Sequence, residues 1–180
     1  MLTLHVPANE LWDRSNAEFI SIKEQTLKLE HSLVSLSKWE SKWKKSFLFS
    51  KDKTPEEIVD YIKCMTLTQN VDPNVYLCLT TSDINRISDY INDSMTATTI
   101  IDDPTEKKSR KVITAEVIYS WMVAQHIPFE CQKWHLNRLL MLIRVCGENT
   151  KQPKKRKSKD ILAQNAALNA ARRKQFNTRG

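Results

Sequence analysis

The chain has 180 residues, of which 41% are hydrophobic, and a formal net charge of +7. Only two glycines occur, which argues against glycine-rich phosphate loops and against sandwiches of many strands joined by tight turns. Residues 151–180 hold ten of the 28 Lys and Arg but one of the 21 acidic residues, so 18 basic and 20 acidic residues precede them. We therefore predict a near-neutral body over residues 1–150 and a basic C-terminal arm over residues 151–180.

Alternating apolar residues predict β-strands near the N-terminus. Residues 2–6 alternate in this way, and so do residues 19–23 and 26–30 on either side of Glu24-Gln25. The last two segments predict an antiparallel hairpin that turns at Glu24-Gln25.

The spacing of apolar residues becomes helical after Ser32, and two helices are predicted in succession. The second begins at a capping box in which Thr54 caps the helix, Pro55 takes its first position and Glu57 bonds back to the cap. The expected buried stripe of the first helix is Leu33, Leu36, Trp39, Trp43 and Phe47. That of the second is Ile58, Tyr61, Ile62 and Met65.

Two further helices are predicted before a polar connection over residues 94–111. Asp72-Pro73 starts a short helix that ends at Leu79, and Ser82 caps the next one. The residues expected to face inward from this second helix are Ile84, Ile87, Tyr90 and Ile91.

The body is predicted to end with two helices. The first runs from Thr114 to about His126, and the second is long, from Pro128 to about Cys146, with Gly147 as its stop. The long helix is apolar over much of its girth, so we expect it to be central, with Leu136, Leu140 and Ile143 buried.

An alanine-rich helix is predicted in the arm, from a cap at Ser158 through Lys159 to about Lys174. The apolar stripe of this helix is thin, so we expect the body to fold without the arm. The fold class predicted for the whole chain is α+β and mainly helical, with N-terminal antiparallel strands packed beside a body of five or six helices and a basic helical arm.

No set of residues predicts catalysis or a cofactor. Cys131 and His135 stand four apart on one predicted helix, but zinc needs more ligands than this pair. Glu56-Glu57 is explained by the capping box, and Asp102-Asp103 has no further acid nearby in sequence. We therefore expect neither an enzyme nor a metal or cofactor site.

Two tryptophans among lysines suggest a surface for a protein partner. Trp and Arg are typical anchors of such surfaces, although core packing is the ordinary role of a tryptophan on an apolar helical stripe. The candidate partner-binding residues are Trp39, Trp43, Lys38, Lys42 and Lys45.

The arm has three interpretations: a solvated tail, a phosphate-binding segment for nucleic acid, or a helix that folds against a partner. It has little aromatic content, so it offers no stacking platform for single strands. The basic residues that define it are Lys154, Lys155, Arg156, Lys157, Arg172, Arg173 and Lys174.

Several collinear stretches resemble the tail assembly chaperones of long-tailed bacteriophages. They are SLVSLSKWESKW (32–43), KTPEEIVDYIKCMTLTQNVDP (53–73), DYINDSMTATTI (89–100), the segment 113–146 and ALNAARRKQFNTRG (167–180). The resemblance therefore runs from about residue 32 to the C-terminus.

The resemblance implies a non-catalytic assembly factor in the host cell cytoplasm. Such chaperones bind the tape-measure protein, a long and largely helical polypeptide, keep it soluble and help to recruit tail-tube subunits. Two alternatives remain open: a nucleic-acid-binding accessory protein that uses the basic arm, and a structural component of the virion.

The membrane is not an expected partner, because no apolar stretch approaches the ~20 residues of a membrane span and the first residues do not resemble a signal peptide. The four cysteines have no close-paired spacing, which fits reduced thiols in a cytoplasm.

Overall fold

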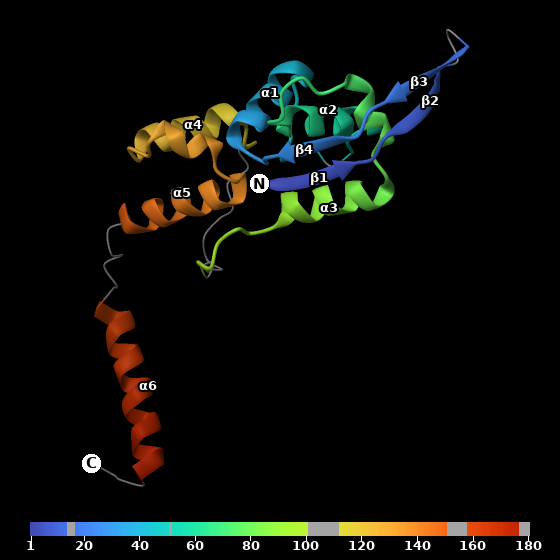
Figure 1. Cartoon of the computed structure of the whole chain (residues 1–180). Helices are drawn as coiled ribbons and strands as arrows, with labels where there is room; N and C mark the ends of the chain where they lie inside the picture. The colour runs from blue at the N-terminus through green and yellow to red at the C-terminus, as the bar shows by residue number, and fades with distance from the viewer. Residues whose placement is uncertain (14–16, 51, 101–111, 151–157, 177–180) are drawn as a thin grey trace. The chain divides into compact units, whose positions relative to one another are not determined.

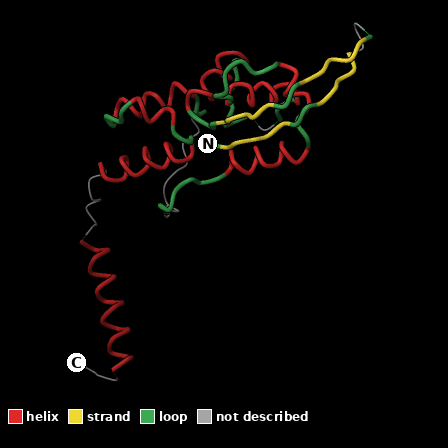
Figure 2. Tube along the Cα trace, in the orientation of Figure 1, coloured by secondary structure: helices red, strands yellow, loops and turns green. Residues whose placement is uncertain are grey.

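The computed structural model describes residues 1–13, 17–50, 52–100, 112–150 and 158–176 and confirms the predicted class, α+β and mainly helical (Figures 1 and 2). The contacts between Cα atoms divide the chain into two compact units, Met1–Gly147 and Glu148–Gly180, which are described separately. The strands are β1 Leu2–Val6, β2 Asn9–Asp13, β3 Glu18–Ile22 and β4 Gln25–Leu29. The helices are α1 Leu33–Trp43, α2 Pro55–Met65, α3 Thr81–Asn92, α4 Ala115–Ala124, α5 Leu136–Thr150 and α6 Ser158–Phe176, with the 3-10 helices η1 Pro73–Cys78 and η2 Phe129–Lys133.

The four strands form one interrupted hairpin, and the predicted turn at Glu24-Gln25 is wrong. β1 pairs antiparallel with β4 and β2 with β3, so the chain reverses direction between β2 and β3. The two ladders are in phase, from the pair Val6 and Gln25 to the pair Asn9 and Ile22. They are separated at Pro7, which has no N–H to donate to a ladder.

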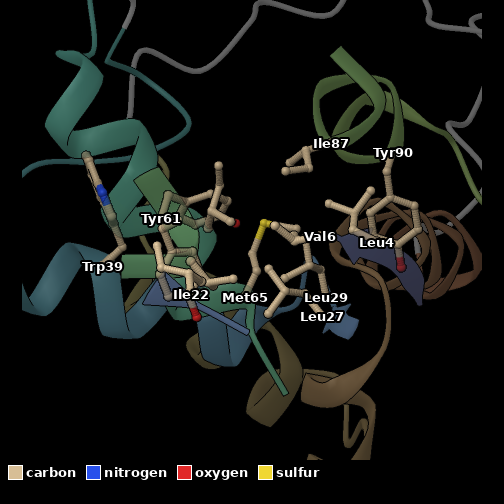
Figure 3. Packing of buried hydrophobic residues seen from close by; sticks show 13 residues of the cluster. Leu4, Val6, Ile22, Leu27, Leu29, Trp39, Tyr61, Met65, Ile87 and Tyr90 are labelled. Atoms are coloured by element: carbon tan, nitrogen blue, oxygen red, sulfur yellow. The ribbon is translucent and has the colours of Figure 1, made fainter. Parts of the chain in front are cut away.

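The strands pack with α1, α2, η1 and α3 around the first of two buried clusters. Alternate residues of β1 and β4 are completely or almost completely buried, and Met65 of α2 and Ile87 of α3 lie against them (Figure 3). The predicted inward faces are confirmed at Tyr61, Ile62 and Met65, but Ile58 is 39% exposed.

A second buried cluster joins α1 to the last two helices of the body. Leu33 and Leu36 of α1 lie in it, while Trp39 of the same helix lies in the first cluster, so α1 connects the two. The members from the later helices include Ala115, Ile118, Met122, Leu136, Leu139 and Ile143.

Capping explains where the helices begin. Thr54 and Glu57 form the predicted capping box of α2. The cap of α3 is Thr80 rather than the predicted Ser82, because Thr80 and Asp83 form a capping box two residues earlier. At the other end of α1, Lys44 adopts a left-handed conformation, so Phe47 lies beyond the helix that it was predicted to extend.

The predicted long helix from Pro128 to Cys146 is wrong, because the chain is extended at Trp134 and forms two separate helices, η2 and α5. The Leu136 N–H donates to the His31 carbonyl at 2.7 Å, and this bond with a distant segment replaces helical continuity. Gly147 does not end α5, which continues to Thr150. The buried face of α5 includes Leu139, whereas Leu140, predicted to be buried, is half-buried.

The second unit contains α6, which covers the predicted helix and extends to Phe176. Its last basic residues, Arg172, Arg173 and Lys174, are exposed. The remaining residues that define the basic arm, Lys154, Lys155, Arg156 and Lys157, lie outside the described residues.

Candidate binding site

The predicted partner-binding face on α1 is in part a contact inside the protein. Trp39 is fully buried, and its indole N–H donates to the Glu57 carbonyl of α2 at 2.8 Å. The prediction that Trp39 anchors a partner is therefore wrong: the ring fills the space between α1 and α2.

Two polar groups near Trp39 on α1, those of Lys42 and Trp43, also bond to α2. Trp43 is half-buried and donates to Asp60 at 2.9 Å, and Lys42 pairs with the same carboxylate. Burial alone would raise the pKa of Asp60, but the hydrogen bonds from Lys42 and Trp43 lower it. A partner role for Trp43 and for the exposed Lys38 stays a prediction.

Lys45, the last member of the predicted face, forms an ion pair with Glu57 at 2.6 Å. The hydrogen bond from Lys45 lowers the pKa of Glu57, and the Thr54 backbone N–H adds to this effect. The Glu57 carboxylate thus serves both the capping box of α2 and the contact with the segment that follows α1.

A buried carboxylate that the sequence analysis did not single out joins α1 to α4. Glu40 is 7% exposed and accepts the Phe47 N–H at 2.8 Å and the Ala115 N–H at 2.7 Å. Ala115 is the first residue of α4, and the neighbouring Thr114 makes no side-chain cap. Glu40 therefore caps α4 from another helix, and no short-range pattern could have shown this.

Cys131 and His135, the pair considered and rejected as metal ligands from the sequence, are not arranged as a metal site. His135 Nε2 lies 2.9 Å from the Tyr90 carbonyl and must donate to it, while Nδ1 accepts from the Asn137 N–H at 3.3 Å. Both ring nitrogens therefore have backbone partners. Within the described ranges, no group of three or more His, Cys, Asp or Glu side chains could hold a metal ion.

A second buried histidine packs against the first. The His31 and His135 ring centroids are 5.1 Å apart, and His31 Nδ1 lies 2.6 Å from the Tyr61 hydroxyl. Burial, and to a lesser degree His135, lowers the pKa of His31 to about 3. His31 lies at the junction between β4 and α1, and we assign the pair no chemistry.

The best candidate for a binding site is an apolar groove between α2 and α3, closed at one side by the segment that follows α1. Its volume is about 360 Å³. Three isoleucines of α3, spaced three and four residues apart, line one wall. The lining residues are Phe47, Leu48, Lys53, Ile58, Tyr61, Ile62, Ile84, Ile87, Ser88, Ile91 and Asn92.

Apolar side chains at the rim of the groove remain accessible to water. Leu48 is 41% exposed and Ile58 39%, and the adjacent Phe49 is 67% exposed. Helical periodicity by itself predicts that Ile58 and all the apolar residues of α3 face the core. The sequence signal for the groove is the excess of apolar residues on two neighbouring helices, together with Leu48-Phe49 in the segment after α1.

Lys53 places one cation in this apolar groove. Its Nζ atom donates to the Ser50 carbonyl at 2.6 Å and lies 4.4 Å from the centroid of the Phe47 ring. Burial lowers the pKa of Lys53, although the Glu57 carboxylate opposes this effect.

Comparisons of the chain with protein families, with characterised proteins and with solved structures find no match. None of the helices in the described part of the chain is both long and apolar enough to cross a membrane.

Proposed function

We propose that this protein is a non-catalytic tail assembly chaperone that works in the cytoplasm of a phage-infected cell and binds a helical segment of the tape-measure protein. The resemblance of residues from about 32 to the C-terminus suggests the partner. The observation that carries the mode of binding is the groove between α2 and α3 with its exposed apolar rim.

A groove of this kind suits an amphipathic helix. Such a helix lays an apolar stripe into a hydrophobic groove, and each large aliphatic side chain that it fully buries contributes about 1.5–3 kcal/mol. Covering the stripe would keep a long helical polypeptide from aggregating through the same residues. This role needs binding and release but no chemical step, and tail-tube subunits could displace the chaperone as they assemble.

Co-expression with tape-measure fragments tests the proposal. Fragments should remain soluble and co-purify with the wild-type chain and with Leu77→Glu, which changes an apolar residue that is 66% exposed outside the groove. Ile58→Glu places a charge in the groove at a partly exposed position and should abolish both effects. If no fragment co-purifies with the wild-type chain, or if both variants behave alike, the proposal is wrong.

Nucleic-acid binding is the second candidate, favoured by the exposed Arg172, Arg173 and Lys174 of α6. Phosphate binding weakens steeply as salt rises, whereas apolar docking does not. Nucleic acid that co-purifies at low salt and is lost when residues 151–180 are deleted would support it. A structural role in the virion would instead leave the protein in purified particles.

A further inference from the structure

Lys53 is a half-buried cation with no carboxylate partner among the residues that the structure describes. Its hydrogen bond is to a backbone carbonyl, which carries only a partial charge. The acid that influences it most, Glu57, is already bonded to Lys45 and to the Thr54 N–H. Among the described residues, the groove thus holds a positive charge without an ion pair.

An occupant of the groove would change the surroundings of this charge. A helix seated against the isoleucines of α3 displaces water from Lys53, which lines the same groove. A desolvated cation without a partner is costly, whereas a carboxylate placed beside it forms a charge-assisted hydrogen bond. Lys53 therefore opposes a helix that brings an apolar or basic residue to this point, and such an opposing contact is a common source of specificity.

We propose that the groove selects an amphipathic helix that carries a carboxylate at the border of its apolar stripe, and that this carboxylate pairs with the Lys53 ammonium. This inference rests on the proposed function and names the chemistry of the helix that the same site takes. It restricts the binding segments of a tape-measure protein to those in which Asp or Glu borders the apolar stripe.

Two synthetic helices of equal composition test the proposal. Each has about 18 residues and the same stripe of leucines at steps of three and four. One carries a Glu at the border of the stripe and the other carries it on the opposite face, so that both have the same net charge. Their affinities for the full chain are measured by fluorescence anisotropy. We expect the border peptide to bind about ten-fold more tightly, the gain typical of one hydrogen bond to a charged group.

Three variants of the full chain assign this preference to one residue. Lys53→Met removes the charge but keeps an unbranched side chain over Phe47, and it should abolish the ten-fold preference. Lys53→Arg should keep it, and so should Lys28→Met, which removes a charge from an exposed position on β4. A preference that persists in Lys53→Met comes from charges elsewhere, including the basic arm, and overturns the proposal. Equal binding of the two peptides, or no binding of either, also overturns it.

The same variants separate this inference from the proposed function. If tape-measure fragments co-purify equally well with the wild type and with Lys53→Met, the chaperone proposal stands and the role of Lys53 is wrong. If the peptide preference depends on Lys53 but no tape-measure fragment binds, the groove accepts an acidic amphipathic helix from another protein.

Discussion

Replacement of Glu40 by Gln tests whether one buried carboxylate holds α1, the segment after it and α4 together. In the wild type, the two oxygens accept one backbone N–H each, from Phe47 and from Ala115. Gln has almost the same shape but presents one carbonyl oxygen and one NH₂ group. One of the two N–H groups therefore loses its acceptor and faces a donor instead.

The size of the effect follows from these contacts. A hydrogen bond to a charged acceptor contributes about 1.5–3 kcal/mol, and a negative charge at a helix N-terminus about 0.3–1 kcal/mol more. Burial of the charge opposes both, as the raised pKa of Glu40 indicates, and Gln relieves that cost. We therefore expect Glu40→Gln to lower the free energy of unfolding by about 2–3 kcal/mol.

Urea unfolding followed by tryptophan fluorescence and far-UV circular dichroism would measure this loss. The matched control is Glu116→Gln, which removes an exposed charge from the first turn of α4, the helix that Glu40 caps. This change should cost no more than about 1 kcal/mol. If Glu40→Gln costs less than about 0.5 kcal/mol, or no more than the control, Glu40 does not cap α4.

Three further predictions concern the core, acid sensitivity and the arm. Leu139→Ala should cost about 2–5 kcal/mol in urea unfolding and the half-buried Leu140→Ala at least about 1 kcal/mol less, and equal costs would contradict the buried face of α5. His31 should make the protein acid-sensitive, because its pKa falls from 6.5 to about 3 on folding and the unfolded chain takes up the proton first. Lowering the pH from about 7 to about 5 should then cost about 2 kcal/mol; His31→Gln should remove this slope and the exposed His5→Gln should keep it. Deletion of residues 151–180 should shift Tm by less than about 2 °C in circular dichroism, whereas a larger drop would mean that α6 stabilises the body.

The sequence predicted well the features that depend on neighbouring residues. The capping box of Thr54 and Glu57 needs residues only three apart, and the structure has it as predicted. The helical periods of α1, α2 and α4 and the alternation of β1, β3 and β4 are likewise local patterns. The start of α3 was two residues off because Thr80 and Ser82 are both acceptable caps, and Asp83 decides between them.

Pairing and burial needed the tertiary structure. The alternation in β3 and β4 predicted strands but not their partners. The pairing of β2 with β3 places the reversal of the chain between these two strands rather than at Glu24-Gln25. The candidate binding groove also needed the tertiary structure. An apolar residue on a helical stripe can face the core or a groove, and only the positions of the neighbouring helices put Ile58 at the rim of a groove.

By itself the sequence determined the mainly helical α+β class, most helix starts and the helical arm, because a hydrogen-bonded turn and its cap lie within a few residues of each other. The tertiary structure alone decided that the chain is extended at Trp134, where the His31 carbonyl takes the Leu136 N–H. It also decided that Trp39 lies in the core and that Lys53 lines a groove with no ion pair to any described carboxylate. The physical reason is that burial and ion pairing depend on segments far apart in the chain, whose contacts no local pattern records.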